Sequence, residues 1–335
     1  MILLFWLIKR KIIIEMDIYI GIDTGSVSTN VIATDKDGEV IFDRYIRTKG
    51  QPINSVKDGM SQLNDFIADK DMTVRAVGVT GSGRQMIGLM VGADVVKNEI
   101  TAHATATIHF HPEARTIFEI GGQDGKIIIL KDGIVTDFSM NTVCAAGTGS
   151  FLDHQAERLG VDIKDFGDLA LSAENEVRIA GRCTVFAESD MIAKQQYGYS
   201  KADIINGLCD ALVRNYLNNL GRGKVLEAPF VFQGGVAANK GIIKAFETQV
   251  GSKIIIPKYF NVMGAIGMAL MAKNQVEQSG AETKFKGFDF IDLEFTPKSF
   301  ECSGCSNACE VIKVLVDGEV KAMWGDKCGK WSSSI

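Results

Sequence analysis

Short apolar runs alternate along this chain with turns rich in glycine and aspartate. Residues 18–48 contain three such runs, separated by turns at 23–26 and 35–38, a pattern that predicts a three-stranded meander. A helical pattern near residues 54–68 and an apolar strand around 76–80 follow, with more helix up to His111. The first part of the chain therefore reads as an α/β unit.

The next segment repeats this order of elements. A strand at residues 115–120 leads into a glycine-rich turn at 121–125, a second strand at 126–130 and a third strand from Ile134. Asp23 and Asp124 occupy the same place in the two copies, each in a turn between two strands. The sequence therefore predicts an internal duplication of one supersecondary unit.

The remainder of the chain is largely helical. Helices are expected at about residues 149–159, 165–173, 185–195, 201–220, 238–249 and 261–272, with strands at 229–232 and 253–256. We expect subdomain I at residues 17–113, completed by the helix at about 261–273, subdomain II at 114–260, a linker at 274–287, and a cysteine-rich metal-binding module at 288–335.

The N-terminus is expected to lie outside this folded part. Residues 1–8 are almost wholly apolar, but the run is too short to span a bilayer. The basic residues 9–11 follow the apolar run, whereas in a signal peptide they would precede it. We therefore interpret residues 1–16 as an extension and place the start of the fold near Met16.

Composition narrows the class of protein. The 335 residues are 46% hydrophobic and 23% charged, as expected for a globular chain with a large core. The net charge of 36 − 41 = −5 argues against a nucleic-acid surface and favours small molecules or proteins as partners. Seven cysteines without a secretory signal favour a cytoplasmic protein with metal or redox thiols over a disulfide framework. No membrane association is expected.

The two duplicated turns suit a bound nucleotide. Glycine lets the backbone approach phosphate oxygens, which N–H groups and hydroxyls then bind. Asp23 and Asp124 would hold Mg²⁺, and Gln123 would orient an attacking water. Either turn alone is more typical of an ordinary hairpin, and the chain contains no P-loop motif.

The arrangement resembles the superfamily of acetate kinases, sugar kinases, Hsp70 and actin. Residues 22–26 look like its first phosphate segment, 120–124 like its second, and 232–237 like its adenosine segment. The resemblance covers about residues 17–273 and implies a duplicated actin-like, ribonuclease H-like ATPase fold with an interdomain nucleotide cleft. The ATP-binding residues that it implies are Thr24, Gly25, Ser26, Gly121, Gly122, Gly147, Thr148, Gly149, Gly234 and Gly235.

Two cysteine-containing segments narrow this resemblance. Residues 141–149 and 181–189 look like those of the activator ATPases of 2-hydroxyacyl-CoA dehydratases, a family that includes the benzoyl-CoA reductase ATPase subunits. The resemblance implies a homodimer in which Cys144 and Cys183 of both chains ligate one 4Fe-4S cluster. It further implies ferredoxin or flavodoxin as the electron donor and an iron-sulfur dehydratase or reductase as the acceptor. Cys209, inside the helix at 201–220, is expected to be a core residue.

Independent arithmetic and local physics agree with a shared cluster. Such a cluster takes four thiolates, and a symmetric dimer supplies 2 × 2. Both cysteines precede predicted helices, whose N-termini favour thiolate and anionic clusters.

Four further cysteines lie in the tail: Cys302, Cys305, Cys309 and Cys328. Their Cys-x₂-Cys-x₃-Cys…Cys spacing around a hairpin at residues 316–319 has the form of a closed metal site. Zinc, a second iron-sulfur cluster and unligated thiols all stay open. The segment looks like one found in larger activator-like proteins, which leaves the partner undetermined.

The leading functional hypothesis is an ATPase that couples hydrolysis to electron transfer, delivering low-potential electrons to a 2-hydroxyacyl-CoA dehydratase-like or related enzyme. A kinase of the same fold acting on a sugar or carboxylate is one alternative. A non-catalytic ATP-sensing protein with a zinc tail is the other.

Overall fold

The structure, a computed structural model, describes residues 16–141 and 144–332. The predicted extension at 1–16 lies outside this range except for Met16, where the first strand begins. The chain divides into two units. The first contains Thr29–Lys97 and Met268–Ile335 with the segment ending at Gly25; the second contains Asn98–Gly267 with Ser26–Ser28.

The first unit is built on a five-stranded sheet in the order β3-β2-β1-β4-β5. Its strands are β1 (Met16–Thr24), β2 (Ser28–Thr34), β3 (Val40–Arg47), β4 (Met72–Thr80) and β5 (Val95–Val96). The helices are α1 (Pro52–Ile67), α2 (Arg84–Val91) and the part of α9 (Met263–Ser279) from Met268 onward. The middle of β1 is buried on both faces, which explains its continuous apolar run.

The second unit repeats this sheet in the order β8-β7-β6-β9-β10. Its strands are β6 (Thr116–Ile120), β7 (Gly125–Lys131), β8 (Ile134–Asn141), β9 (Phe230–Gln233) and β10 (Ile254–Ile255). Its helices are α3 (Glu99–Phe110), α4 (Gly149–Leu159), α5 (Ile163–Leu171), α6 (Thr184–Gln196), α7 (Lys201–Leu220) and α8 (Lys240–Val250).

The two sheets confirm the predicted duplication. In the first sheet β1 pairs antiparallel with β2 and parallel with β4; in the second, β6 pairs antiparallel with β7 and parallel with β9. The turns at residues 23–26 and 121–125 therefore each follow the first strand of a copy. They lie at the edge of the sheet where the parallel partner strand, β4 or β9, also ends. This common position gives the two candidate phosphate segments equivalent places in their units.

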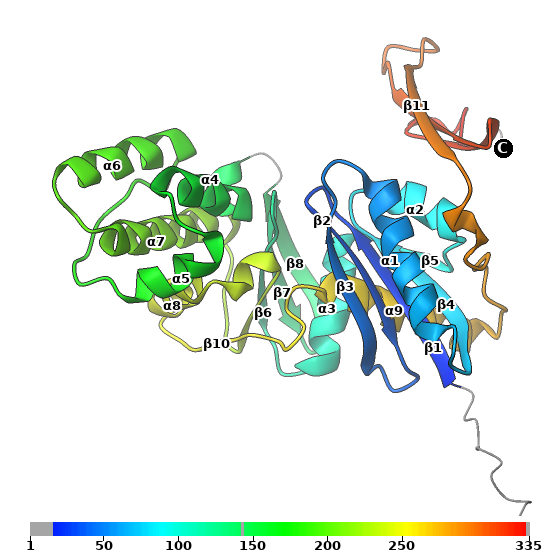
Figure 1. The fold of residues 1–335 in the computed structure, drawn as a ribbon, viewed down its shortest axis with the longest axis horizontal. Helices are drawn as coiled ribbons and strands as arrows, with labels where there is room; N and C mark the ends of the chain where they lie inside the picture. The colour runs from blue at the N-terminus through cyan, green and yellow to red at the C-terminus, as the bar shows by residue number, and fades with distance from the viewer. Residues whose placement is uncertain (1–15, 142–143, 333–335) are drawn as a thin grey trace, which may run out of the picture. The chain divides into compact units, whose positions relative to one another are not determined.

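The core of the second unit lies on both faces of its sheet. Helices α4 to α8 cover one face (Figure 1), and there Phe118 stacks on Phe246 with ring centroids 4.8 Å apart. On the other face, Ile117 and Ile128 pack against Ile100 of α3. Alternate residues of β6 thus serve two different cores, as a strand requires.

Two features differ from the predicted organisation. Helix α9 continues to Ser279, through the first part of the predicted linker, because Glu277 lies 3.9 Å from Lys273 one turn earlier and accepts a hydrogen bond from Tyr19. Helix α3, expected within subdomain I, is grouped with the second unit.

The tail forms a separate antiparallel sheet of β11 (Phe295–Glu301), β12 (Glu310–Val316) and β13 (Glu319–Trp324). Asp317 and Gly318 both have positive φ angles, of 48° and 86°, as the tight turn of the predicted hairpin requires. None of the helices in the described part of the chain has the length and apolar character needed to cross a bilayer.

Gly78 of β4 provides a test of the packing between the first sheet and α9. A Cβ at this position would lie 2.3 Å from the backbone oxygen of Met268, which cannot move without shifting the helix. We expect Gly78→Ala to lower the free energy of unfolding by about 2–3 kcal/mol in urea titrations. Gly59→Ala, whose nearest neighbour is a Val31 side-chain carbon, should cost less. An unchanged urea midpoint for Gly78→Ala would contradict this packing.

Candidate functional site

The second phosphate segment is a tight turn that contains two glycines, Gly121 and Gly122. Residues 121–124 connect β6 to β7, and the N–H of Gly121 donates to the carbonyl of Asp124 over 3.0 Å. A Cβ on Gly121 would lie 2.9 Å from Asp124 Oδ1. The turn therefore presents main-chain atoms and the carboxylate of Asp124 at the end of the sheet.

Three glycine segments that are far apart in sequence meet at this turn. The N–H of Gly149 donates to the carbonyl of Gly121 over 2.9 Å, and the N–H of Ser150 donates to Gly122 over 2.8 Å. A Cβ on Gly234, whose φ is 91°, would lie 2.4 Å from the carbonyl oxygen of Ile120. We call these segments, 121–124, 147–149 and 234–235, the glycine cradle. Glycine-rich backbone of this kind can lie against phosphate and ribose groups.

The first phosphate segment lies in the other unit, at the end of β1. The carbonyl of Thr24 accepts the N–H of Gly83 over 3.1 Å and the hydroxyl of Ser82 over 3.3 Å. The side chain of Thr24 is fully buried, and its hydroxyl has no hydrogen-bond partner among the described residues. An orphaned hydroxyl beside Asp23 fits a missing polar ligand such as phosphate or hydrated Mg²⁺.

A buried ammonium group stands behind Asp124. Lys126 is 2% exposed, and its Nζ lies 2.9 Å from carboxylate oxygens of Glu99, Glu119 and Asp124. Although burial lowers the pKa of Lys126, these three carboxylates more than offset it and raise that pKa well above its ordinary value. Asp124, predicted as a magnesium residue, thus has one oxygen on Lys126 and the other beside Gly121.

Glu119 links this charge cluster to the cradle. Its Oε1 lies 2.7 Å from where a Cβ on Gly234 would be, and its Oε2 accepts from Lys126. Burial raises the pKa of Glu119 to about 8, against the lowering effect of Lys126. Neither Glu119 nor Lys126 is among the site residues predicted from the sequence. The available signal was a charged residue inside each of two otherwise apolar strands.

The predicted adenosine segment is held by helix α3. Gln233 donates through Nε2 to Nδ1 of His103 over 3.1 Å, and its Oε1 accepts from the Thr107 hydroxyl over 3.0 Å. Burial lowers the pKa of His103 to about 3, so the ring is neutral and Nδ1 is an acceptor. Gln233 is therefore fixed immediately before Gly234 and Gly235.

The two body cysteines lie on loops that rest on the same residue of α7. Asn215 donates to the carbonyl of Gly181, two residues before Cys183, and its Oδ1 lies 3.1 Å from where a Cβ on Gly147 would be, three residues after Cys144. Both cysteines are half-buried. Both thiols therefore lie in the second unit. Each cysteine is close in sequence to a residue that contacts Asn215.

Their local settings differ. Cys183 is the N-cap of α6, as predicted, and no side-chain cap bond engages its sulfur. Cys144 precedes only the single 3₁₀ turn η1 (Ala145–Gly147), because α4 starts later, at Gly149. Instead, the side chain of Asn141 holds Cys144 by accepting from its N–H over 3.0 Å and donating to its carbonyl over 2.7 Å.

Within the described residues, no three His, Cys, Asp or Glu side chains gather closely enough to hold a metal ion. Cys144 and Cys183 are both free thiols of the second unit. Cys209, by contrast, is fully buried in α7, and burial raises the pKa of its thiol to about 12, which confirms it as a core residue.

Of the four tail cysteines, Cys302 directly follows β11 and Cys309 directly precedes β12, while Cys305 lies in the loop between these strands and Cys328 lies after β13. Cys302 and Cys309 are paired by a backbone hydrogen bond of 2.8 Å. The sulfur of Cys302 accepts from the indole N–H of Trp331 over 3.3 Å and the backbone N–H of Gly304 over 3.4 Å, which together lower the pKa of its thiol. Cys305 and Cys328 are exposed, and the four sulfurs do not form a closed site in this structure.

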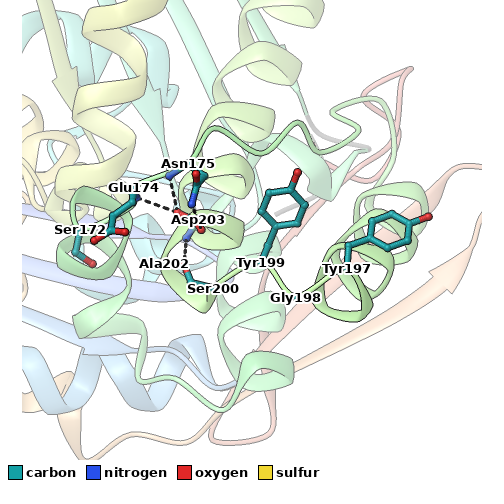
Figure 2. Close-up of a pocket in the computed structure, with 9 residues that line it drawn as sticks. All are labelled: Ser172, Glu174, Asn175, Tyr197, Gly198, Tyr199, Ser200, Ala202 and Asp203. Atoms are coloured by element: carbon teal, nitrogen blue, oxygen red, sulfur yellow. Dashed lines mark hydrogen bonds between the residues drawn. The ribbon is translucent and has the colours of Figure 1, made fainter.

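A hollow of about 590 Å³ lies at the start of α7 and is lined by Asp203 (Figure 2). The carboxylate of Asp203 accepts the backbone N–H groups of Asn175 and Glu174, both over 2.9 Å, which holds the pKa of Asp203 below its usual range. The carboxylate of Asp203 therefore ties the loop at residues 174–175 to helix α7.

The repeated sheets and the glycine cradle define a class: nucleotide-binding proteins with the duplicated fold of the actin-like ATPases. The chain belongs to the BadF/BadG/BcrA/BcrD ATPase family, which it matches over residues 20–272. The tail module lies outside this match.

Three relatives illustrate the similarity. The (R)-2-hydroxyglutaryl-CoA dehydratase activating ATPase of Acidaminococcus fermentans is 34% identical over 260 residues, covering 77% of this chain and 98% of that protein. A benzoyl-CoA reductase subunit of Thauera aromatica is 27% identical over 265 residues, covering 76% and 93%. The solved activator of the 2-hydroxyisocaproyl-CoA dehydratase from Clostridium difficile, with bound ADPNP, has a TM-score of 0.72 at 31% identity, covering 78% and 97%.

The raised pKa of Glu119 makes stability depend on pH. The folded state holds the proton up to about pH 8, whereas an unfolded glutamate releases it near its ordinary value of 4.5, so stability falls as the pH rises between the two. Glu119→Gln, which mimics the protonated carboxyl, should therefore gain in Tm relative to the wild type from about pH 5 to about pH 9. The control is the exposed Glu157→Gln. A Tm difference independent of pH would refute the assignment.

Proposed function

We propose that this protein is an ATP-dependent activator whose homodimer carries one shared 4Fe-4S cluster and passes low-potential electrons to an iron-sulfur partner enzyme. The observation that carries the proposal is that Cys144 and the glycine cradle belong to one short segment. Cys144 is followed by Gly147, which lies on Asn215, and by Gly149, which donates to Gly121. The names of the relatives support a 2-hydroxyacyl-CoA dehydratase or a related reductase as the partner.

We propose the following groups for binding the nucleotide and its magnesium ion. The N–H groups of Gly121, Gly149 and Gly234 are bonded within the fold, so Gly122 and Gly235 are the cradle glycines proposed to donate to phosphates. Thr24 would offer its unengaged hydroxyl, and Asp23 and Asp124 would bind Mg²⁺ through its waters. Gln123 is the proposed residue for positioning the attacking water. Because Lys126 already neutralises part of Asp124, that carboxylate keeps a fixed orientation before the metal arrives.

Coupling between the nucleotide state and the cluster thiols would depend on the hydrogen bond between Gly149 and Gly121. Phosphate release at the second segment would change the position of Gly121, and the bonded segment that begins at Cys144 would follow it. A nucleotide state influences the thiols only if it favours one arrangement of this segment over another.

Each chain supplies Cys144 and Cys183, so two chains together supply the four thiolates of the cluster, which when bound accepts and donates one electron. A dimer surface beside Cys183 is supported by two exposed apolar residues of α6. Val185 is 67% exposed and Phe186 is 64% exposed, which is costly for large apolar side chains in a monomer. A ferredoxin or flavodoxin is the proposed electron donor.

Removal of the body cysteines tests the proposal. Cys144→Ala and Cys183→Ala, purified anaerobically, should lose the cluster while ATP affinity changes less than about threefold, because neither side chain belongs to the cradle. The wild type and the core variant Cys209→Ala should contain about four iron atoms and four sulfides per dimer at the body cysteines, with additional iron only if the tail also holds a cluster. Full iron content in either body variant would overturn the cluster assignment, and a colourless wild type with substrate-dependent ATP use would favour the kinase alternative.

We also propose that the tail cysteines hold a metal, either zinc or a further iron-sulfur cluster. The two N–H groups donated to the sulfur of Cys302 support this, since such bonds stabilise thiolates that serve as ligands. Trp331, three residues after Cys328, donates to the sulfur of Cys302 and so joins the segment after β13 to the end of β11. Metal binding would order the exposed Cys305 and Cys328, because binding and local folding are coupled.

Metal analysis of the tail variants distinguishes the open possibilities. We expect Cys305→Ser with Cys328→Ser to remove about one zinc per chain, or about four irons if the tail holds a cluster, and to leave the iron at the body cysteines unchanged. Ser303→Ala in the same loop is the matched control. Identical zinc and iron contents in the double variant and the wild type would show unligated tail thiols.

A further inference from the structure

Strand β2 carries a buried amide near the end of the first sheet. Asn30 is 5% exposed and lies on β2, inside the sheet between β1 and β3. Asparagine is unfavourable in such a place, because its side chain gives up its hydrogen bonds to water. The Oδ1 atom of Asn30 is buried and has no hydrogen-bond partner among the described residues. An unpaired polar atom of this kind lowers the stability of the fold until a bound group supplies the missing partner.

The register of the sheet places Asn30 beside Asp23. Asn30 pairs with Asp23 of β1, and Asp23 pairs in turn with Thr80 of β4. The three strands are neighbours in the first sheet (Figure 1). Directly paired residues have their side chains on the same face, so the three polar groups form one row. This row lies where β1 ends, next to the first phosphate segment.

The nearest hydroxyls in this row and on this strand are already bonded within the fold. Thr80 is fully buried, and its hydroxyl donates to the carbonyl of Lys97 over 2.9 Å. Thr29, the residue before Asn30, shares a hydrogen bond of 3.1 Å with Thr48. The fold thus satisfies these two threonines and leaves the amide oxygen of Asn30 for a donor from outside the chain.

A hydrated magnesium ion at Asp23 would supply such a donor. Mg²⁺ keeps several waters when carboxylates bind it, and each of these waters can donate a hydrogen bond. A nucleotide phosphate offers mainly acceptor oxygens, so it does not complete an amide oxygen. An amide also adds an acceptor without a second negative charge, which would repel the phosphates that the ion accompanies.

We infer that Asn30 is a further magnesium-binding residue, whose Oδ1 accepts a hydrogen bond from a water of the ion proposed to lie at Asp23. The inference rests on the proposed function, because it requires a magnesium nucleotide at the first phosphate segment. It adds a residue that lies outside the glycine and aspartate motifs of the site. Because Asn30 would contact only the hydration shell of the ion, its effect belongs to magnesium-dependent binding and not to the binding of metal-free nucleotide.

Calorimetric titrations of the anaerobically purified full chain with ADP test this role. The affinity for ADP is measured in excess Mg²⁺ and again in EDTA, and the ratio of the two gives the magnesium-dependent part. We expect Asn30→Ala to lower the affinity in Mg²⁺ about fivefold, through the loss of one hydrogen bond, and to leave the affinity in EDTA unchanged. Asn30→Asp keeps an acceptor and should retain at least the wild-type ratio.

Thr34→Val is the matched control. Thr34 belongs to the same strand and is fully buried, and its hydroxyl also lacks a partner among the described residues. It pairs with Tyr19, however, and not with a residue of the phosphate segment. The variant therefore removes an orphaned buried hydroxyl away from the ion, and it should match the wild type in both titrations.

The two titrations separate the possible failures. Equal affinities of Asn30→Ala and the wild type in Mg²⁺ would overturn the inference alone. A loss of the same size in Mg²⁺ and in EDTA would also overturn it, because the residue would then act on the fold or on the nucleotide itself. A wild type that binds no ADP would remove the proposed nucleotide site and the inference with it, while iron analysis tests the cluster separately. If circular dichroism shows that Asn30→Ala does not fold, Asn30→Val replaces it with the same expected loss.

Discussion

The close contact of three backbone turns around Gly121 is the constraint on which the second unit depends. Gly149 donates to Gly121, and a side chain on Gly234 would collide with the carbonyl of Ile120. Backbone atoms can approach this closely only where Cβ is absent. The contact joins the end of β6, the start of α4 and the end of β9, so the candidate nucleotide site and the packing of the unit share one origin.

Behind this contact lies a charged core. The ammonium of Lys126 holds Glu99, Glu119 and Asp124 at equal distances of 2.9 Å, in a position almost without solvent. A buried charge of this kind is tolerated only when it is paired and hydrogen-bonded. This group of charged side chains therefore fixes the carboxylate of Asp124, which is proposed to bind magnesium. It also supports the strands that carry two of the glycine turns. The cost in free energy of burying charge at this position is reflected in the raised pKa of Glu119.

The cysteine loops extend the same organisation toward the surface. Asn215 supports the loops of Cys144 and Cys183. The segment from Cys144 to Gly149 and the loop of Cys183 thus belong to one unit.

The sequence by itself determined the duplication, the strand and helix order, the three glycine segments and the division of the cysteines into body, core and tail. These features are local: apolar periodicity, glycine turns and motif spacing act over a few residues. Only the tertiary structure decided that Lys126 and Glu119 lie behind the cradle and that Asn215 joins the two cysteine loops. Those contacts link residues far apart in the chain, and no local pattern specifies which distant partner a charged or amide side chain will meet. The extension of α9 to Ser279 has the same cause, since a contact with Tyr19 in β1 supports a polar stretch that resembles a linker.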